Sequence, residues 1–244
     1  MSDSNPYSPS QTAAFPNNEV VARRVSIEPI ELYKRSMALM GDQYWLFLGI
    51  TLVGMLLGSM VPMGILMGPM MVGIYMCFAD RERGNQVEFG TLFKGFDQFV
   101  SSFIAVLIMI GASLLVMIPL MIMMAVAMVL VLPRNDGGNQ GSLMAIPVIL
   151  GFYLVLFIAV FLIQLPFLFT FQLIADRRLT GPQAVGLSFR GVQKNIGGCI
   201  FLSVVLGLLS MLASAACIIP AFFLMPISMG VLFLAYRDIF GPVA

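Results

Sequence analysis

The sequence has no histidine and few charged residues, and these two shortages narrow the class of protein. Only 10% of its 244 residues are charged, whereas 59% are hydrophobic and the mean hydropathy is +0.97. Soluble domains contain roughly 25% charged residues, so this chain lacks the polar surface that water would require. Because the net charge is only +1, we expect no nucleic-acid partner, since binding phosphates requires a concentrated basic face.

Nothing in the sequence indicates a bound metal or catalysis. The lack of histidine removes the commonest metal ligand, and Cys77, Cys199 and Cys217 lie in apolar runs without a Cys-x-x-Cys pair. The 20 methionines are soft ligands suited to Cu(I), but unbranched methionine is also an adaptable packing residue. The sequence has no phosphate-binding loop, His-Glu-x-x-His helix or Gly-x-Ser-x-Gly turn. We therefore predict no catalytic residue, no metal, no cofactor and no enzymatic activity.

Long runs without charged residues are the main feature of the sequence, and they predict membrane-spanning helices. A helix needs about 20 apolar residues to cross a bilayer. The first and last runs are long enough for two short spans each, turning near 61–64 and 216–220. The two middle runs are each predicted to form one long, kinked span. The runs cover residues 44–79, 99–132, 144–175 and 197–236.

These runs predict an all-α integral membrane protein with six transmembrane helices, arranged as three hairpins. Each hairpin follows an amphipathic segment, at 26–40, 89–96 or 180–194, of the kind that lies in the headgroup plane. An alternative with eight spans needs additional breaks at Pro119 and near Pro166, where no polar turn residues occur.

The chain repeats one unit, made of an amphipathic segment, an apolar hairpin and an acid–arginine pair. Asp80-Arg81 aligns without a gap on Asp176-Arg177. Lys94 corresponds to Arg190 in the same alignment, and the hairpin entries Asp42-Gln43 and Asp97-Gln98 share a related signature.

One membrane domain at 26–240 is therefore predicted to contain three units, at about 29–83, 84–178 and 179–240. The preceding residues 1–25 are rich in Ser, Asn and Pro, and such a composition predicts a disordered tail.

Lysine and arginine fall on one side of the predicted membrane. Each unit contributes an even number of spans, so all three units enter from the same face. Of the 13 Lys and Arg residues, only Arg134 is predicted in a connection on the opposite face. Because cytoplasmic loops carry the excess of Lys and Arg, both termini are predicted to be cytoplasmic.

Polar side chains without charge occur inside the predicted spans. Gln164 and Gln172 lie roughly on one helical face, and with Thr170 they form a candidate polar crevice. Hydrogen bonding between neighbouring helices is the alternative role for these residues.

Basic residues near the span ends are candidates for contacts with lipid headgroup phosphates. In the alternative interpretation the acid–arginine pairs at the span ends anchor the helix ends and pair with each other. The candidates are Arg81, Lys94, Arg177, Arg190 and Lys194.

Short motifs in the chain resemble those of a group of uncharacterised bacterial inner-membrane proteins, families of unknown function with about six spans. The likeness rests on Leu92-Phe-Lys-Gly-Phe96, on Pro69 and Gly73, and on the terminal Tyr236-Arg-Asp-Ile-Phe240, and it covers about residues 29–240. The resemblance implies a multi-pass protein of the bacterial cytoplasmic membrane. It transfers no functional residue, because the group has no settled activity.

Two functions are compatible with these features. The first is a non-enzymatic scaffold or binding subunit that contacts membrane lipids, and other membrane proteins through the long spans 99–132 and 144–175. The alternative is a transporter or channel for a neutral or apolar solute, since internal repeats recur in transporter folds.

Overall fold

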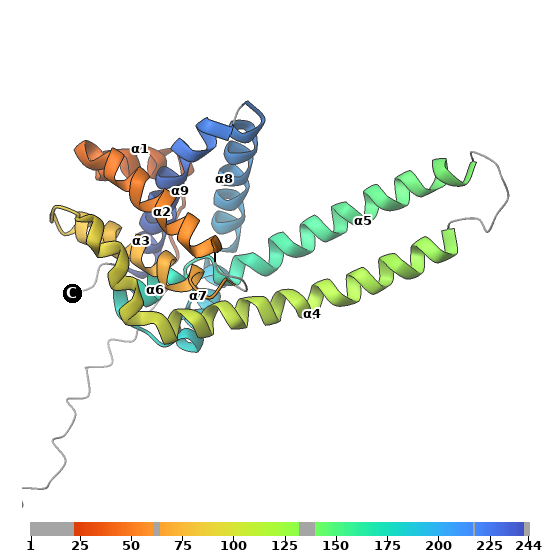
Figure 1. Cartoon of the computed structure of the whole chain (residues 1–244), viewed down its shortest axis with the longest axis horizontal. Helices are drawn as coiled ribbons and strands as arrows, with labels where there is room; N and C mark the ends of the chain where they lie inside the picture. The colour runs from red at the N-terminus through yellow and green to blue at the C-terminus, as the bar shows by residue number, and fades with distance from the viewer. Residues whose placement is uncertain (1–21, 61–63, 132–139, 217, 242–244) are drawn as a thin grey trace, which may run out of the picture.

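The computed structural model describes residues 22–60, 64–131, 140–216 and 218–241, and all regular structure in these ranges is helical (Figure 1). Within them, five helical stretches are long and apolar enough to cross a membrane. The chain is therefore a multi-pass membrane protein whose described part is all-helical, as the uncharged runs predict. The five stretches are Pro29–Met60, Phe89–Val129, Ile149–Arg177, Ile196–Ala215 and Ile219–Phe240.

The N-terminal part contains an amphipathic helix followed by two apolar helices. Helix α1 (Pro29–Met40) begins with a proline, whose missing N–H is not needed in a first turn. A turn of 3-10 helix, η1 (Gly41–Gln43), leads into α2 (Tyr44–Met60), and α3 (Met67–Glu82) follows. Helix α3 has 16 residues, fewer than the roughly 20 that cross a bilayer. Helix α3, which corresponds to one of the six predicted spans, therefore does not reach that length in the described part of the chain.

The middle part contains the longest helix of the described residues. The amphipathic segment forms a 3-10 helix, η3 (Phe89–Gln98), and α4 (Phe99–Val131) continues through Pro119 without interruption. The span predicted as one kinked helix at 144–175 is instead divided into three elements. Pro166 lies at the division, because proline removes a backbone donor and its ring clashes with the preceding turn. The elements are α5 (Gln140–Gln164), η4 (Leu165–Phe167) and α6 (Thr170–Arg177).

The C-terminal part consists of α7 (Gly181–Lys194), α8 (Ile196–Ala216) and α9 (Ile218–Phe240). Helix α7 begins after Thr180, whose backbone N–H donates a hydrogen bond to the Gln183 side chain. This reciprocal arrangement satisfies donors that a helix N-terminus otherwise leaves without partners.

The helices divide into a bundle and an arm. In Figure 1, α4 and α5 run side by side away from the other helices, which pack together at one end of the molecule. The bundle holds the buried core, in which the Phe78 ring lies between Phe47, at 4.6 Å, and Phe233, at 5.9 Å between centroids. On α4 the buried side chains end at Val106, and no described side chain of α5 is buried. We call α5 and the part of α4 that follows Val106 the arm.

Contacts within the bundle follow the same order three times. Helix α3 packs against η3, α6 and η4 pack against α7, and α9 packs against α1. The approach of α3 to η3 is close, because a methyl group on Gly73 would overlap the carbonyl oxygen of Leu92, and one on Gly95 that of Pro69. The last helix of each predicted unit thus packs against the amphipathic helix of the next unit, and α9 packs against the first one.

Only residues 22–25 of the tail predicted at 1–25 belong to the described part of the chain, and they lie against the bundle. The N–H of Arg23 donates to the carbonyl oxygen of Ile239 at 2.8 Å. Asn195 contacts the same segment twice, accepting from the N–H of Val25 at 2.9 Å and donating to the carbonyl oxygen of Arg23 at 2.8 Å. The segment before α1 is therefore held by α7 and α9. The connections at 61–63 and around Arg134 lie outside the described residues.

Candidate functional site

The charged ends of α3, α6 and α9 meet in one ion-pair network. At its centre, the side chain of Asp176 has no exposed surface. Its carboxylate accepts hydrogen bonds from Arg237 at 2.7 and 3.1 Å, from the Tyr236 hydroxyl at 2.8 Å and from Arg83 at 3.3 Å. The Nε atom of Arg237 lies 2.6 Å from a carboxylate oxygen of Glu82. Removing one partner of such a buried pair leaves an uncompensated charge, so the network fixes how the three helix ends meet.

Arg81 and Arg177, two of the five candidate headgroup residues, form hydrogen bonds with other groups of the protein. Arg81 donates to the carbonyl oxygen of Leu39 at 3.0 Å and to Gln43 at 3.2 Å, and it forms a salt bridge with Asp42. Arg177 donates to the carbonyl oxygens of Phe240 and Gly241, at 2.9 and 3.1 Å, and thereby binds the C-terminal end of α9.

The other three candidates differ in their surroundings. Lys194 donates to the carbonyl oxygen of Ala22 at 3.1 Å and so helps to hold the segment before α1. Arg190 is exposed on α7, and Lys94 is exposed on η3. Neither makes a side-chain hydrogen bond or salt bridge to another described residue. Lys94 lines a pocket.

This pocket, which we call the charged pocket, lies where α3, η3 and α6 meet. It has a volume of about 370 Å³ and its lining is mostly polar. Arg178 at its rim has a φ of 51° and a left-handed backbone, which residues other than glycine seldom adopt. Thr91 and Gln98 line the pocket together with six charged residues, Asp80, Arg83, Lys94, Asp97, Asp176 and Arg178.

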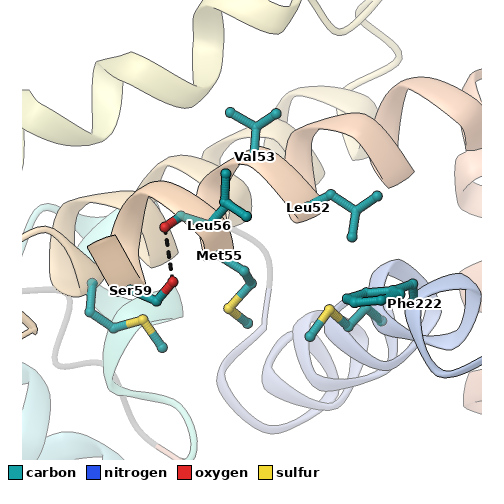
Figure 2. Close-up of a pocket in the computed structure, with 8 residues that line it drawn as sticks. Leu52, Val53, Met55, Leu56, Ser59 and Phe222 are labelled. Carbon is teal, nitrogen blue, oxygen red and sulfur yellow. Dashed lines mark hydrogen bonds between the residues drawn. The ribbon is translucent and has the colours of Figure 1, made fainter. Parts of the chain in front are cut away.

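A second, apolar groove lies between α2 and α9. Figure 2 shows side chains of α2 facing Phe222 across it, and the Ser59 hydroxyl turned back to the Leu56 carbonyl oxygen, to which it donates at 2.9 Å. The only hydroxyl in the lining is therefore already bonded within its own helix. The groove has a volume of about 510 Å³ and offers hydrocarbon and thioether surface from Leu52, Val53, Met55, Leu56, Met67, Phe222 and Met225.

The residues of the candidate polar crevice do not lie together on one helical face. Gln164 is exposed at the end of α5, and η4 separates it from Thr170 and Gln172, which are buried on α6. Both amide atoms of Gln172 and the hydroxyl of Thr170 have no hydrogen-bond partner among the described residues. The α-helix is interrupted between Gln164 and Thr170, so spacing along one continuous helix did not apply.

Sequence reasoning found the acid–arginine pairs but not their partners. The pairing of Asp176 with Arg237, rather than with the adjacent Arg177, joins two predicted units. The only available signal was that three charged helix ends were predicted on one side of the membrane, and it carried no information on which ends touch.

These features define the class, an all-helical multi-pass membrane protein with an ion-pair network where three helix ends meet. No family model, curated protein or solved structure matches the chain. The resemblance to bacterial inner-membrane families therefore stays a prediction from the motifs.

Proposed function

We propose that this is a non-enzymatic protein of the bacterial cytoplasmic membrane that binds lipids and packs against other membrane proteins. The observation that carries the proposal is the contrast between charged helix ends that pair with one another and helices that expose apolar side chains beyond them. On the arm, Leu115 is 76% exposed and Val129 72% exposed. In water such a surface would aggregate, whereas lipid tails or an apolar partner would cover it.

The proposed topology has six spans in three repeated hairpins. Helix α3 is the span that is added to the five longer stretches, and both termini lie in the cytoplasm. The matching order of contacts, α3 with η3, α6 with α7 and α9 with α1, supports three equivalent units. Salt bridges such as Arg35 with Asp238, at 2.9 Å, bring the charged ends of separate units together, which supports one common face.

Cysteine accessibility tests this topology. In a variant without the three native cysteines, one new cysteine replaces either Asn85 or Gly137, and intact spheroplasts are treated with a membrane-impermeant maleimide. We expect labelling at position 137 in intact spheroplasts and at position 85 only after lysis. Labelling of both positions in the same compartment would contradict the single-face arrangement.

Lipid binding is tested by purification in a mild maltoside detergent followed by native mass spectrometry. We expect phospholipid molecules to remain bound to the intact protein after extensive washing. Recovery of a monomer free of lipid and of other proteins would overturn the proposed function.

A transporter for a neutral solute remains the second candidate, and the unpaired amide of Gln172 favours it. A buried polar group without a partner is costly, and a passing solute or water would supply the missing hydrogen bonds. Flux of small neutral solutes into proteoliposomes, lost in Gln172→Leu and kept in Gln164→Leu, would support transport. No flux above that of empty vesicles would exclude it.

A further inference from the structure

We propose that the charged pocket binds a zwitterionic group, a phosphate ester joined by a short linker to a primary ammonium, and that a lipid headgroup supplies it. This inference rests on the proposed function, because a lipid-binding protein in a bilayer meets such headgroups at its charged face. It goes further in naming the chemistry and the residues.

The balance of paired and unpaired charges in the charged pocket indicates a zwitterion. Asp176 is compensated by Arg237, and Asp80 lies 3.8 Å from Arg83. Three lining residues form no salt bridge within the described part of the chain, namely the cations Lys94 and Arg178 and the carboxylate of Asp97. Two free cations suit a phosphodiester, which accepts charge-assisted hydrogen bonds. The free carboxylate suits an ammonium and would repel a bare phosphate dianion.

A comparison of equivalent positions explains why this pocket is open. In the first unit, Arg81 fills the space beside the hairpin entry, with bonds to Asp42 and to Gln43. The equivalent residue of the second unit is Arg177, which instead binds the carbonyl oxygens at the end of α9.

The second hairpin entry therefore keeps its polar groups available. Asp97 and Gln98, which correspond to Asp42 and Gln43, line the charged pocket and form no salt bridge or side-chain hydrogen bond with other described residues. The protein thus closes this position in one unit and leaves it open to a ligand in the next.

The position of η3 favours a lipid over a soluble ligand. Phe89, Phe93 and Phe96 are exposed on the same short helix that carries Lys94 and Asp97. An amphipathic helix with exposed Phe side chains lies in the membrane interface, with its apolar face at the boundary between headgroups and acyl chains. The charged pocket therefore lies where a lipid phosphate lies, next to apolar surface that receives its tails.

Arg178 supplies a further sign that the pocket is built for a ligand. Its left-handed backbone conformation at the end of α6 is unfavourable for a residue with a side chain. A glycine at this position would end the helix without that cost. The cost is consistent with a requirement for a guanidinium at the rim of the charged pocket.

The test is native mass spectrometry of the full-length protein, released from maltoside micelles after incubation with equal amounts of three phospholipids. Phosphatidylethanolamine carries both proposed groups, phosphatidylglycerol lacks the ammonium, and phosphatidylcholine has a quaternary ammonium without N–H donors. We expect phosphatidylethanolamine adducts to exceed each of the others about tenfold, the factor that one charge-assisted hydrogen bond supplies.

Three variants assign the two charges. Asp97→Asn should reduce the binding of phosphatidylethanolamine about tenfold to the level of phosphatidylglycerol, while the double variant Lys94→Gln/Arg178→Gln should weaken both lipids. Arg190→Gln is the matched control, because Arg190 is the exposed equivalent of Lys94 and lines no described pocket. All of the replaced side chains are exposed, so the variants should elute as the wild type does in size-exclusion chromatography.

The outcomes separate this inference from the proposed function. Equal binding of the three lipids, or a preference that survives Asp97→Asn, overturns the inference, while retained lipid of any kind leaves the proposed function in place. Loss of all lipid from the wild type overturns both. Calorimetric titration with O-phosphoethanolamine and with inorganic phosphate identifies the source. Binding of O-phosphoethanolamine as tight as that of the lipid would support the zwitterion and overturn the lipid assignment.

Discussion

The bundle and the arm both contain apolar helices without charged residues, such as α2 and α4, yet they differ in what holds them in place. In the bundle, Asp176 and Arg237 are buried and the backbones of α3 and η3 touch at Gly73 and Gly95. On the arm, α4 and α5 contact each other but expose most of their described side chains. The bundle is thus fixed by specific contacts, whereas the arm depends on whatever surrounds it. Substitutions in the two regions should therefore have very different effects.

The largest effect is expected where the bundle buries its charges. Arg237→Met leaves Asp176 buried with fewer partners, which should lower the free energy of unfolding by about 3–5 kcal/mol. Titration of the purified protein with sodium dodecyl sulfate in mixed micelles measures this change. Adding Asp176→Leu to Arg237→Met should restore part of the loss, because the uncompensated charge is then removed. A double variant as unstable as the sum of both single variants would show that the two side chains act independently.

Close backbone contact is the next most sensitive feature of the bundle. In Gly95→Ala the new methyl group overlaps the Pro69 carbonyl oxygen and the Gly73 backbone, so η3 must move away from α3. We expect a loss of about 3 kcal/mol, at the upper end of the usual cost of overpacking. The control is Gly90→Ala in the same helix, since nothing lies within 4 Å of that position. Equal losses in both variants would assign the effect to η3 itself.

A smaller effect is expected from the salt bridge at the edge of the bundle. Arg81→Gln removes the bonds to Asp42 and to the Leu39 carbonyl oxygen, with an expected loss of about 1–2 kcal/mol. Arg190→Gln should change stability by less than about 0.5 kcal/mol, because its side chain is exposed. Thermal unfolding in the same detergent compares the two variants, and a larger loss for Arg190→Gln would contradict this account.

The smallest effect on unfolding, and one of opposite sign, is expected on the arm. Gly111 on α4 is exposed and has nothing within 4 Å of an added methyl group. Gly111→Ala should therefore stabilise α4 slightly, by up to about 1 kcal/mol, through its higher helix propensity. Detergent titration is again the measurement. A marked loss of stability would mean that another molecule packs closely against the arm in the purified sample.

The sequence was sufficient to predict the helical class and the positions of most spans. Runs without charge require helices in lipid, and α4, α8 and α9 lie within or close to the predicted boundaries. The charged helix ends and the amphipathic segments were also recognisable, since Asp80-Arg81 and Asp176-Arg177 share one local pattern.

What the sequence did not reveal depends on contacts between helices. Apolar side chains look alike whether they face lipid or a neighbouring helix, so the arm was indistinguishable from the bundle. The sequence also did not decide between a kink and a break at a proline: the alternative with eight spans placed breaks at Pro119 and near Pro166, but α4 continues through Pro119 and the chain is interrupted at Pro166. Once the helix was broken, the helical spacing that placed Gln164 beside Gln172 no longer applied. Whether Asp176 pairs with Arg237 or with Arg177 depends on how the helices pack, and the sequence alone does not show this.

The pairing of Asp176 with Arg237 also constrains how the protein is made. The two residues are separated by 61 positions in the chain, so the ribosome delivers the acid well before its arginine. During that interval the Asp176 carboxylate lacks the hydrogen bonds that Tyr236 and Arg237 donate in the folded protein. A chain that ends before α9 therefore lacks the arginine that compensates this buried carboxylate.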